Sequence, residues 1–238
     1  MIGINRPENR NAINSATARK LCEAFNAFEA DVTSPVAVLY GVGGSFCAGF
    51  DILEMDADGD QVSIDILMTH EGSVGPTRRH IQKPVVCGIN GYCVANGLEL
   101  ALMCDLRVME ETATLGFFNR RFGVPVIDGG TARLPAMIGL SRALDLVLTG
   151  RQVAAKEAYD IGIANRIVPT GCALHKALEL AKILAKFPQS ALNHDRNSIY
   201  SAVYESSSFN QSTQNEIMYT SREMITEMSD GIKWFNKS

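Results

Sequence analysis

The sequence lacks the features that would place it in several large classes of protein. Lysine and arginine total 22 against 26 aspartates and glutamates, so no basic surplus is available to displace counterions, and we expect no nucleic-acid partner. No apolar run approaches the roughly 20 residues of a membrane-spanning helix, so no membrane partner is expected either. Strand-like residues follow Met1 directly, without the pattern of a signal or transit peptide. We therefore expect a cytoplasmic protein, with a mitochondrial or peroxisomal location left open.

The spacings of metal and redox sites are also missing. The six cysteines lie scattered in apolar runs without any Cys-x-x-Cys pair, which is typical of buried thiols in a reducing compartment. The four histidines show no metal-ligand spacing, and no Gly-x-Ser-x-Gly motif is present. Residues 54–65 imitate a calcium loop but lack its first aspartate and its bidentate glutamate. The sequence therefore predicts neither a metal site nor a serine hydrolase.

What the sequence does contain is the alternation of strands and helices that is typical of an α/β domain. Asn14 is placed to cap a helix whose apolar side chains share one face. Residues 36–40 form a continuous apolar run, as in a strand that is covered on both sides. A strand–helix–strand order predicts a right-handed crossover and a largely parallel sheet. Further on, Gly130 is expected to begin a helix and Ser141 to cap the next one.

Only helical patterns follow Cys172. Pro188 interrupts them, and helices are expected over residues 191–204 and 216–228. The sequence therefore predicts an α/β core domain over residues 1–170 and an all-helical region over residues 171–238. Such a region has little core of its own, so we expect it to pack on the main domain or on a neighbouring subunit.

The strongest chemical pattern lies in residues 84–131. An apolar run ends at Asn90-Gly91, as a buried strand and turn would, and Asn96-Gly97 then opens a leucine-rich helix with Glu99 in its first turn. Unpaired N–H groups and a carboxylate thus lie side by side, which suits an anion or a carbonyl oxygen that is becoming one. The helix dipole alone can favour a first-turn acid. However, the dipole does not explain why the carboxylate lies among leucines, and this apolar neighbourhood favours a catalytic role.

Two other polar segments allow more than one interpretation. Residues 41–46 approach a dinucleotide-binding fingerprint, but Phe46 occupies a glycine position and no helix pattern follows. Glycines that turn backbone N–H groups toward a ligand explain the loop better. The basic cluster over residues 77–80 is interpreted as a solvated helix face.

Six blocks of residues, taken together and in order, identify a known pattern. They are Asn5-Arg6-Pro7 with Asn11-Ala12-Ile13, Phe46 to Asp51 with Glu54-Met55, Lys83-Pro84 with Asn90-Gly91-Tyr92, Gly97 to Ala101 with Cys104-Asp105, Gly129-Gly130-Thr131, and Leu148-Thr149-Gly150. With these blocks the chain resembles the enoyl-CoA hydratase/isomerase (crotonase) family over nearly its whole length. The resemblance implies an α/β spiral of ββα units with a C-terminal all-helical region. It also implies an acyl-CoA thioester substrate, no cofactor apart from the coenzyme A of that substrate, and a homotrimer or hexamer.

The resemblance also implies site residues. The backbone amides of Phe50 and Asn96 would form an oxyanion hole; Asn96 replaces the family's usual glycine but tolerates left-handed backbone angles better than most residues. Glu99 matches one of the two hydratase glutamates. Asn119 occupies the place of the second, where it can bind water but cannot transfer a proton. Asp128, the nearest spare carboxylate, is as readily explained as an acid at a helix N-terminus as by catalysis.

The family pattern further implies substrate contacts at Arg10, Ala12, Ala48, Asp51 and Gly97. Arg10 is a candidate for the nucleotide end of coenzyme A, whereas Leu53 stands where many relatives carry a lysine. The implied activity is that of an enoyl-CoA hydratase with Glu99 as acid and base. Two alternatives stay open. One is a double-bond isomerase that uses Glu99 or Asp128, and the other is an acyl-CoA-binding homologue without activity, because of Asn119.

Overall fold

The computed structural model describes residues 1–54, 70–218 and 220–235. Contacts within the chain divide it into two compact units, Met1–Ala181 and Lys182–Ser238. The first unit therefore extends beyond the predicted division after residue 170. Apart from Glu54, the segment that was compared with a calcium loop lies outside the described residues.

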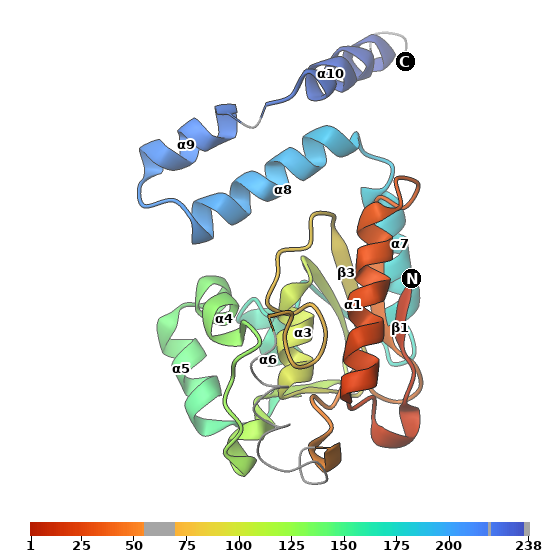
Figure 1. The fold of residues 1–238 in the computed structure, drawn as a ribbon, viewed down its shortest axis with the longest axis vertical. Helices are drawn as coiled ribbons and strands as arrows, with labels where there is room; N and C mark the ends of the chain where they lie inside the picture. The colour runs from red at the N-terminus through yellow and green to blue at the C-terminus, as the bar shows by residue number, and fades with distance from the viewer. Residues whose placement is uncertain (55–69, 219, 236–238) are drawn as a thin grey trace. The chain divides into compact units, whose positions relative to one another are not determined.

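A five-stranded parallel sheet organises the first unit (Figure 1), as the strand–helix–strand order predicts. Its strand order is β1-β2-β3-β5-β8, with Val38 of β2 opposite Val86 of β3. A smaller sheet holds β4, β6 and β7, of which only β7 runs antiparallel to its neighbour. The strands are β1 Ile2–Ile4, β2 Ala37–Gly41, β3 Val85–Ile89, β4 Tyr92–Val94, β5 Leu106–Glu110, β6 Thr114–Gly116, β7 Val153–Ala154 and β8 Arg166–Val168.

The helices of the first unit begin where local chemistry favours them. In α1, the Asn14 side chain accepts a hydrogen bond from the Thr17 amide at 3.0 Å, which confirms the predicted cap. Four apolar side chains on one face of α1 are buried, Ala18, Leu21, Phe25 and Phe28. The helices are α1 Ser15–Ala30, α3 Asn96–Met103, α4 Gly130–Ile138, α5 Leu140–Thr149, α6 Ala155–Asp160 and α7 Ala173–Leu184, with 3-10 turns η1 Pro7–Asn9 and η2 Phe118–Phe122.

Two predicted helix boundaries are wrong. Ser141 does not cap α5, because Gly139 adopts a left-handed φ of 83° and the helix already begins at Leu140. The second unit contains α8 Gln189–Tyr204, α9 Phe209–Met218 and α10 Arg222–Phe235, so the single helix predicted over residues 216–228 is two helices. Within that unit, the Glu227 carboxylate of α10 accepts hydrogen bonds from the amides at the start of α8.

The basic cluster at residues 77–80 is not a solvated helix face. These residues form turns and bends, and Thr77 is fully buried. Arg79 lies within ion-pair distance of Glu29 and Glu71, at 3.6 and 3.4 Å. The charge of Arg79, which the sequence suggests is exposed to solvent, is therefore paired with acids of other segments.

The described residues also bear on the expected thiols, metals and membrane spans. All six cysteines are free. Cys47, Cys87, Cys93 and Cys104 are buried, as predicted, and burial raises the pKa of Cys47 to about 12, whereas Cys22 and Cys172 are only half-buried. No helix among the described residues is long and apolar enough to cross a membrane. In the same residues, no three histidine, cysteine, aspartate or glutamate side chains are grouped as metal ligands.

Candidate active site

A strained turn sets the start of α3. Ala95, between β4 and the helix, adopts φ 53° and ψ −131°, a region that non-glycine residues enter at a cost of about 1–3 kcal/mol. The segment over residues 47–50 runs beside this turn, because the Val94 amide donates to the Cys47 carbonyl at 3.0 Å. A Cβ on Gly49 would lie 3.2 Å from the Asn96 nitrogen. The backbone just before Phe50 therefore passes close to the first residue of α3.

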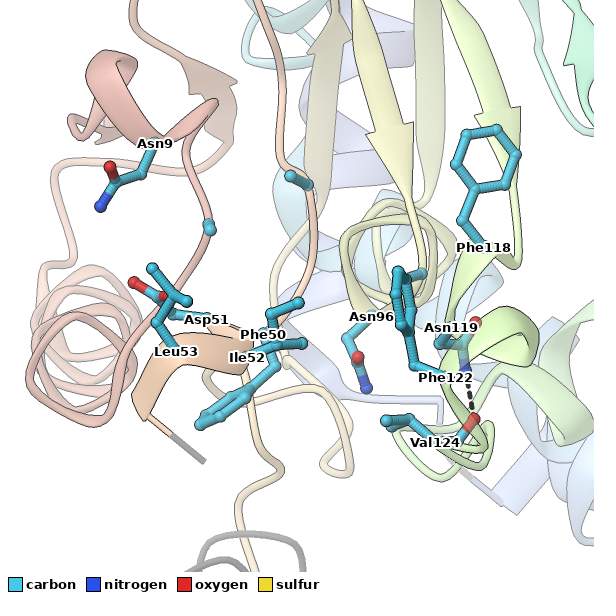
Figure 2. A pocket seen from close by; sticks show the side chains of 13 residues that line it. Asn9, Phe50, Asp51, Ile52, Leu53, Asn96, Phe118, Asn119, Phe122 and Val124 are labelled. Carbon is cyan, nitrogen blue, oxygen red and sulfur yellow. Dashed lines mark hydrogen bonds between the residues drawn. The ribbon is translucent and has the colours of Figure 1, made fainter. Parts of the chain in front are cut away.

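The backbone amides of Phe50 and Asn96 donate to no acceptor among the residues that the structure describes. For Asn96 this follows from helix geometry, because the first N–H groups of a helix have no intrahelical acceptor. Both residues line a pocket of about 410 Å³, which is large enough for a small ligand (Figure 2). The pocket is lined by Asn9, Ala12, Ala48, Phe50, Asp51, Ile52, Leu53, Ala95, Asn96, Phe118, Asn119, Phe122 and Val124.

Glu99 is fully buried and is not among the residues that line this pocket. Its Oε1 accepts hydrogen bonds from the amides of Asp128 and Gly130, at 2.7 and 2.9 Å. Its Oε2 accepts from the Asn96 side chain at 3.2 Å. The pKa of Glu99 is raised from 4.5 to about 8. Burial is the largest cause, the nearby charge of Asp128 acts in the same direction, and the two amide hydrogen bonds act against them. Glu99 can thus hold or release a proton near neutral pH.

The structure brings Asp128 next to Glu99. Asp128 is fully buried and accepts hydrogen bonds from the Ser73 amide at 2.8 Å, the Ser73 hydroxyl, the Thr77 hydroxyl at 3.0 Å and the Asn96 side chain at 2.7 Å. Arg78 lies 3.7 Å from the same carboxylate. The Asp128 side chain does not cap α4, whose N-cap is Gly129. Sequence reasoning missed Thr77 and Arg78 as partners of Asp128, because it placed residues 77–80 on a solvated helix face.

Asn119, in η2, also lines the pocket. Its Nδ2 donates to the Val124 carbonyl at 2.9 Å, as the dashed line in Figure 2 marks. Its Oδ1 is buried and has no hydrogen-bond partner among the described residues. The hydrogen bond to Val124 fixes which end of the amide is the acceptor. Asn119 therefore offers a neutral acceptor and cannot replace a carboxyl group.

Three of the five predicted substrate contacts, Ala12, Ala48 and Asp51, line the pocket. The carboxylate of Asp51 is paired with Arg6 at 2.9 Å, a partner that the sequence does not reveal. The other two contacts do not belong to the lining. The Arg10 guanidinium lies 5.2 Å from the centre of the Tyr92 ring, and Gly97 packs its backbone against Cys47.

The raised pKa of Glu99 leads to a prediction about stability. The unfolded chain loses this proton near pH 4.5 and the folded chain near pH 8, so Glu99 makes folding less favourable as the pH rises through this window. Wild type should lose this free energy of unfolding as the pH rises and Glu99→Gln should not. The difference in free energy of unfolding, variant minus wild type, should therefore increase by on the order of a few kcal/mol from pH 5 to pH 9. Urea unfolding at both pH values measures the difference. Glu23→Gln, on the exposed side of α1, is the control for the substitution itself. A gain that is independent of pH would contradict the prediction.

Comparison with known proteins decides the family. Residues 1–237 match the sequence model of the enoyl-CoA hydratase/isomerase family. The chain belongs to this family. Among named relatives, it is 33% identical over 186 residues to the mevalonyl-coenzyme A hydratase of Aspergillus fumigatus, covering 78% of this chain and 68% of that protein. It is also 33% identical over 192 residues to the 2,3-dehydroadipyl-CoA hydratase of Escherichia coli K12, covering 81% and 74%.

Solved structures of the enoyl-CoA hydratase/isomerase family share the whole fold. An enoyl-CoA hydratase from Mycobacterium tuberculosis H37Rv matches with a TM-score of 0.88 and 31% identity, covering 99% of this chain and 90% of that one. An enoyl-CoA hydratase from Bacillus anthracis matches with a TM-score of 0.90 and 27% identity, covering 99% and 91%. These similarities confirm the predicted crotonase-like α/β fold with its C-terminal helical region.

Proposed function

We propose that this member of the family is an acyl-CoA enzyme that adds water to 2-enoyl-CoA thioesters. In this proposal the amides of Phe50 and Asn96 hold the thioester oxygen, and Glu99 transfers the proton. One observation carries the proposal. Phe50 and Asn96, whose backbone N–H groups have no acceptor among the described residues, line the same pocket, and a carboxyl group with a pKa near 8 lies in the first turn of the helix that begins at Asn96.

The reaction divides into two proton transfers. The Glu99 carboxylate takes a proton from water while the water oxygen bonds to the β carbon of the substrate. The electrons of the double bond move toward the thioester oxygen, where the Phe50 and Asn96 amides stabilise the developing negative charge. Glu99 then returns the proton to the α carbon. A preorganised donor of this kind is worth about 3–4 kcal/mol in the transition state, and a positioned acid or base contributes about 10²–10⁴-fold.

The neighbourhood of Glu99 suits this role. A carboxyl with a pKa near 8 is poised between its acid and base forms at physiological pH, as alternating proton uptake and release requires. The names of related proteins, including 2,3-dehydroadipyl-CoA hydratase and mevalonyl-coenzyme A hydratase, agree with an acyl-CoA thioester as substrate and with hydration as the reaction.

A second candidate is isomerisation of a carbon–carbon double bond in an enoyl-CoA. Asn119 favours it, since Asn119 cannot serve as a second acid or base, and isomerisation needs only one group that removes a proton and returns it elsewhere. Glu99 and Asp128 share the donor Asn96, so either carboxylate could be that group. A third candidate is acyl-CoA binding without catalysis. It is favoured by the absence of Glu99 from the residues that line the pocket.

Two substrates separate these candidates. Crotonyl-CoA tests hydration and 3-hexenoyl-CoA tests isomerisation, each followed by the change in absorbance of the conjugated thioester. The proposal expects saturable turnover of crotonyl-CoA by the folded chain. Turnover of 3-hexenoyl-CoA alone would establish the isomerase. Turnover of neither, with measurable binding of the thioester, would establish the binding protein.

A further inference from the structure

Asn96 belongs both to the pocket and to the surroundings of the acid Glu99, because it lines the pocket and its side chain donates a hydrogen bond to Glu99. Asn96 lines the pocket, whereas Glu99 is fully buried and is absent from the lining. In Figure 2 the Asn96 amide lies between Phe50 and Ile52 on one side and Asn119 and Val124 on the other. Asn96 is itself only 2% exposed, so its side chain is packed into the wall.

The hydrogen bonds hold this side chain in place. Asn96 Nδ2 donates to Asp128 Oδ2 at 2.7 Å and to Glu99 Oε2 at 3.2 Å, and it lies 3.4 Å from the Ser73 hydroxyl oxygen. An amide nitrogen carries two hydrogens, and its two shortest contacts are with the two acids. Glu99 Oε1 is already occupied by the amides of Asp128 and Gly130. Each oxygen of Glu99 therefore has a partner within the protein, and the partner of Oε2 is the Asn96 side chain.

The backbone and the side chain of Asn96 would affect a bound ligand in different ways. Its backbone N–H is available to an acceptor in the pocket, whereas its side chain covers the group that has to reach that ligand. Removal of the side chain would leave the N–H in place. It would delete the hydrogen bonds from Asn96 Nδ2 to Glu99 Oε2 and Asp128 Oδ2, leaving both of these oxygens without that partner.

We propose that the Asn96 side chain is a cover over the Glu99–Asp128 pair, and that it has to turn away before Glu99 can exchange a proton with the contents of the pocket. Asn96 is thus a positioning residue as well as a backbone donor. The effect of this cover on catalysis rests on the proposed function. Its effect on the access of pocket contents to Glu99 does not.

An apolar carbodiimide, dicyclohexylcarbodiimide, tests access directly, because it enters apolar pockets and modifies protonated carboxyl groups. Peptide mass spectrometry of the full chain gives the rate of modification at Glu99. We expect the rate to rise at least about tenfold in Asn96→Gly, since the cover is held by two hydrogen bonds to carboxylates. Asn96→Ala should give the same result and replaces the glycine variant if that variant does not fold.

Two controls distinguish a removed cover from a loosened fold. Asn119→Ala deletes another side chain that lines the same pocket but donates to Val124 and not to Glu99, and Glu99 should react in it as slowly as in wild type. Glu110 is a buried carboxylate that accepts from the amides of Gly171 and Ala173, and its modification rate should not change in any variant. Equal Glu99 rates in wild type and both Asn96 variants would overturn the proposal. A parallel rise at Glu110 would overturn it too.

Activity gives a separate result. If the proposed function holds, Asn96→Gly should raise kcat for crotonyl-CoA about tenfold and change KM by less than about threefold, because the backbone donor is retained. Absence of turnover in every variant would contradict the proposed hydratase. The carbodiimide rates would still decide whether Asn96 covers Glu99.

Discussion

Glu99→Gln should lower kcat for hydration of crotonyl-CoA by about 10²–10⁴-fold, because glutamine cannot take a proton from water or return one to carbon. Glutamine has nearly the same shape, and its Oε1 can still accept from the amides of Asp128 and Gly130, so α4 should keep its start. The dissociation constant for an acyl-CoA should change by less than about threefold, since the variant keeps the amides of the pocket. Steady-state kinetics and calorimetric titration with butyryl-CoA measure the two quantities.

The matched control is Glu110→Gln. Glu110 is also a buried carboxylate that accepts hydrogen bonds from two backbone amides, but these belong to the start of α7 and its preceding turn. We expect this variant to keep the wild-type kcat. If Glu99→Gln also kept most of the wild-type activity, proton transfer by Glu99 would be ruled out, and its role would be limited to accepting hydrogen bonds from the amides of Asp128 and Gly130.

Gly97→Ala should damage both the fold and the site. A Cβ at this position would overlap the carbonyl oxygen of Cys47, and it would lie 2.9 Å from the Cys47 Cβ. The backbone of Cys47 cannot rotate out of the way as a flexible side chain can. The segment over residues 47–50 therefore has to move away from α3. We expect a loss of about 2–4 kcal/mol in the free energy of unfolding. Displacement of the Phe50 amide should also lower kcat/KM by at least about 100-fold.

Gly44→Ala is the control for this substitution. Gly44 lies in the glycine-rich loop just before the segment over residues 47–50, but a Cβ there would meet no atom within 4 Å. Its free energy of unfolding should stay within about 0.5 kcal/mol of wild type. Urea unfolding and crotonyl-CoA kinetics on both variants give the comparison. Wild-type activity in a stable Gly97→Ala protein would show that close approach of the two segments is not needed.

The parts of the fold that depend on local chemistry could be predicted from the sequence. Asn14 marks the start of α1, because a side-chain oxygen before an amphipathic segment accepts the first amides of a helix. The continuous apolar run at residues 36–40 indicates a strand buried on both sides, and β2 is buried in this way. Asn96-Gly97 likewise indicates the start of α3, and Glu99 lies in its first turn as predicted.

The parts that depend on partners from distant segments could not be predicted. Thr77 and Arg78 look solvated in the sequence, yet both approach Asp128, which lies some fifty residues further along the chain. The contact between the Asn96 side chain and Asp128 requires the loop before α4 to fold back over α3. Neither periodicity nor spacing carries this information, so the sequence indicates the acids but not the side chain that covers them.

A structure of the full chain bound to an unreactive acyl-CoA analogue tests the central claim most directly. The account predicts that the thioester oxygen lies about 3 Å from the backbone nitrogens of both Phe50 and Asn96, with the Asn96 side chain turned away and Glu99 facing the acyl carbons. A thioester oxygen that contacts neither nitrogen, in a complex where the acyl group occupies the pocket, would contradict it.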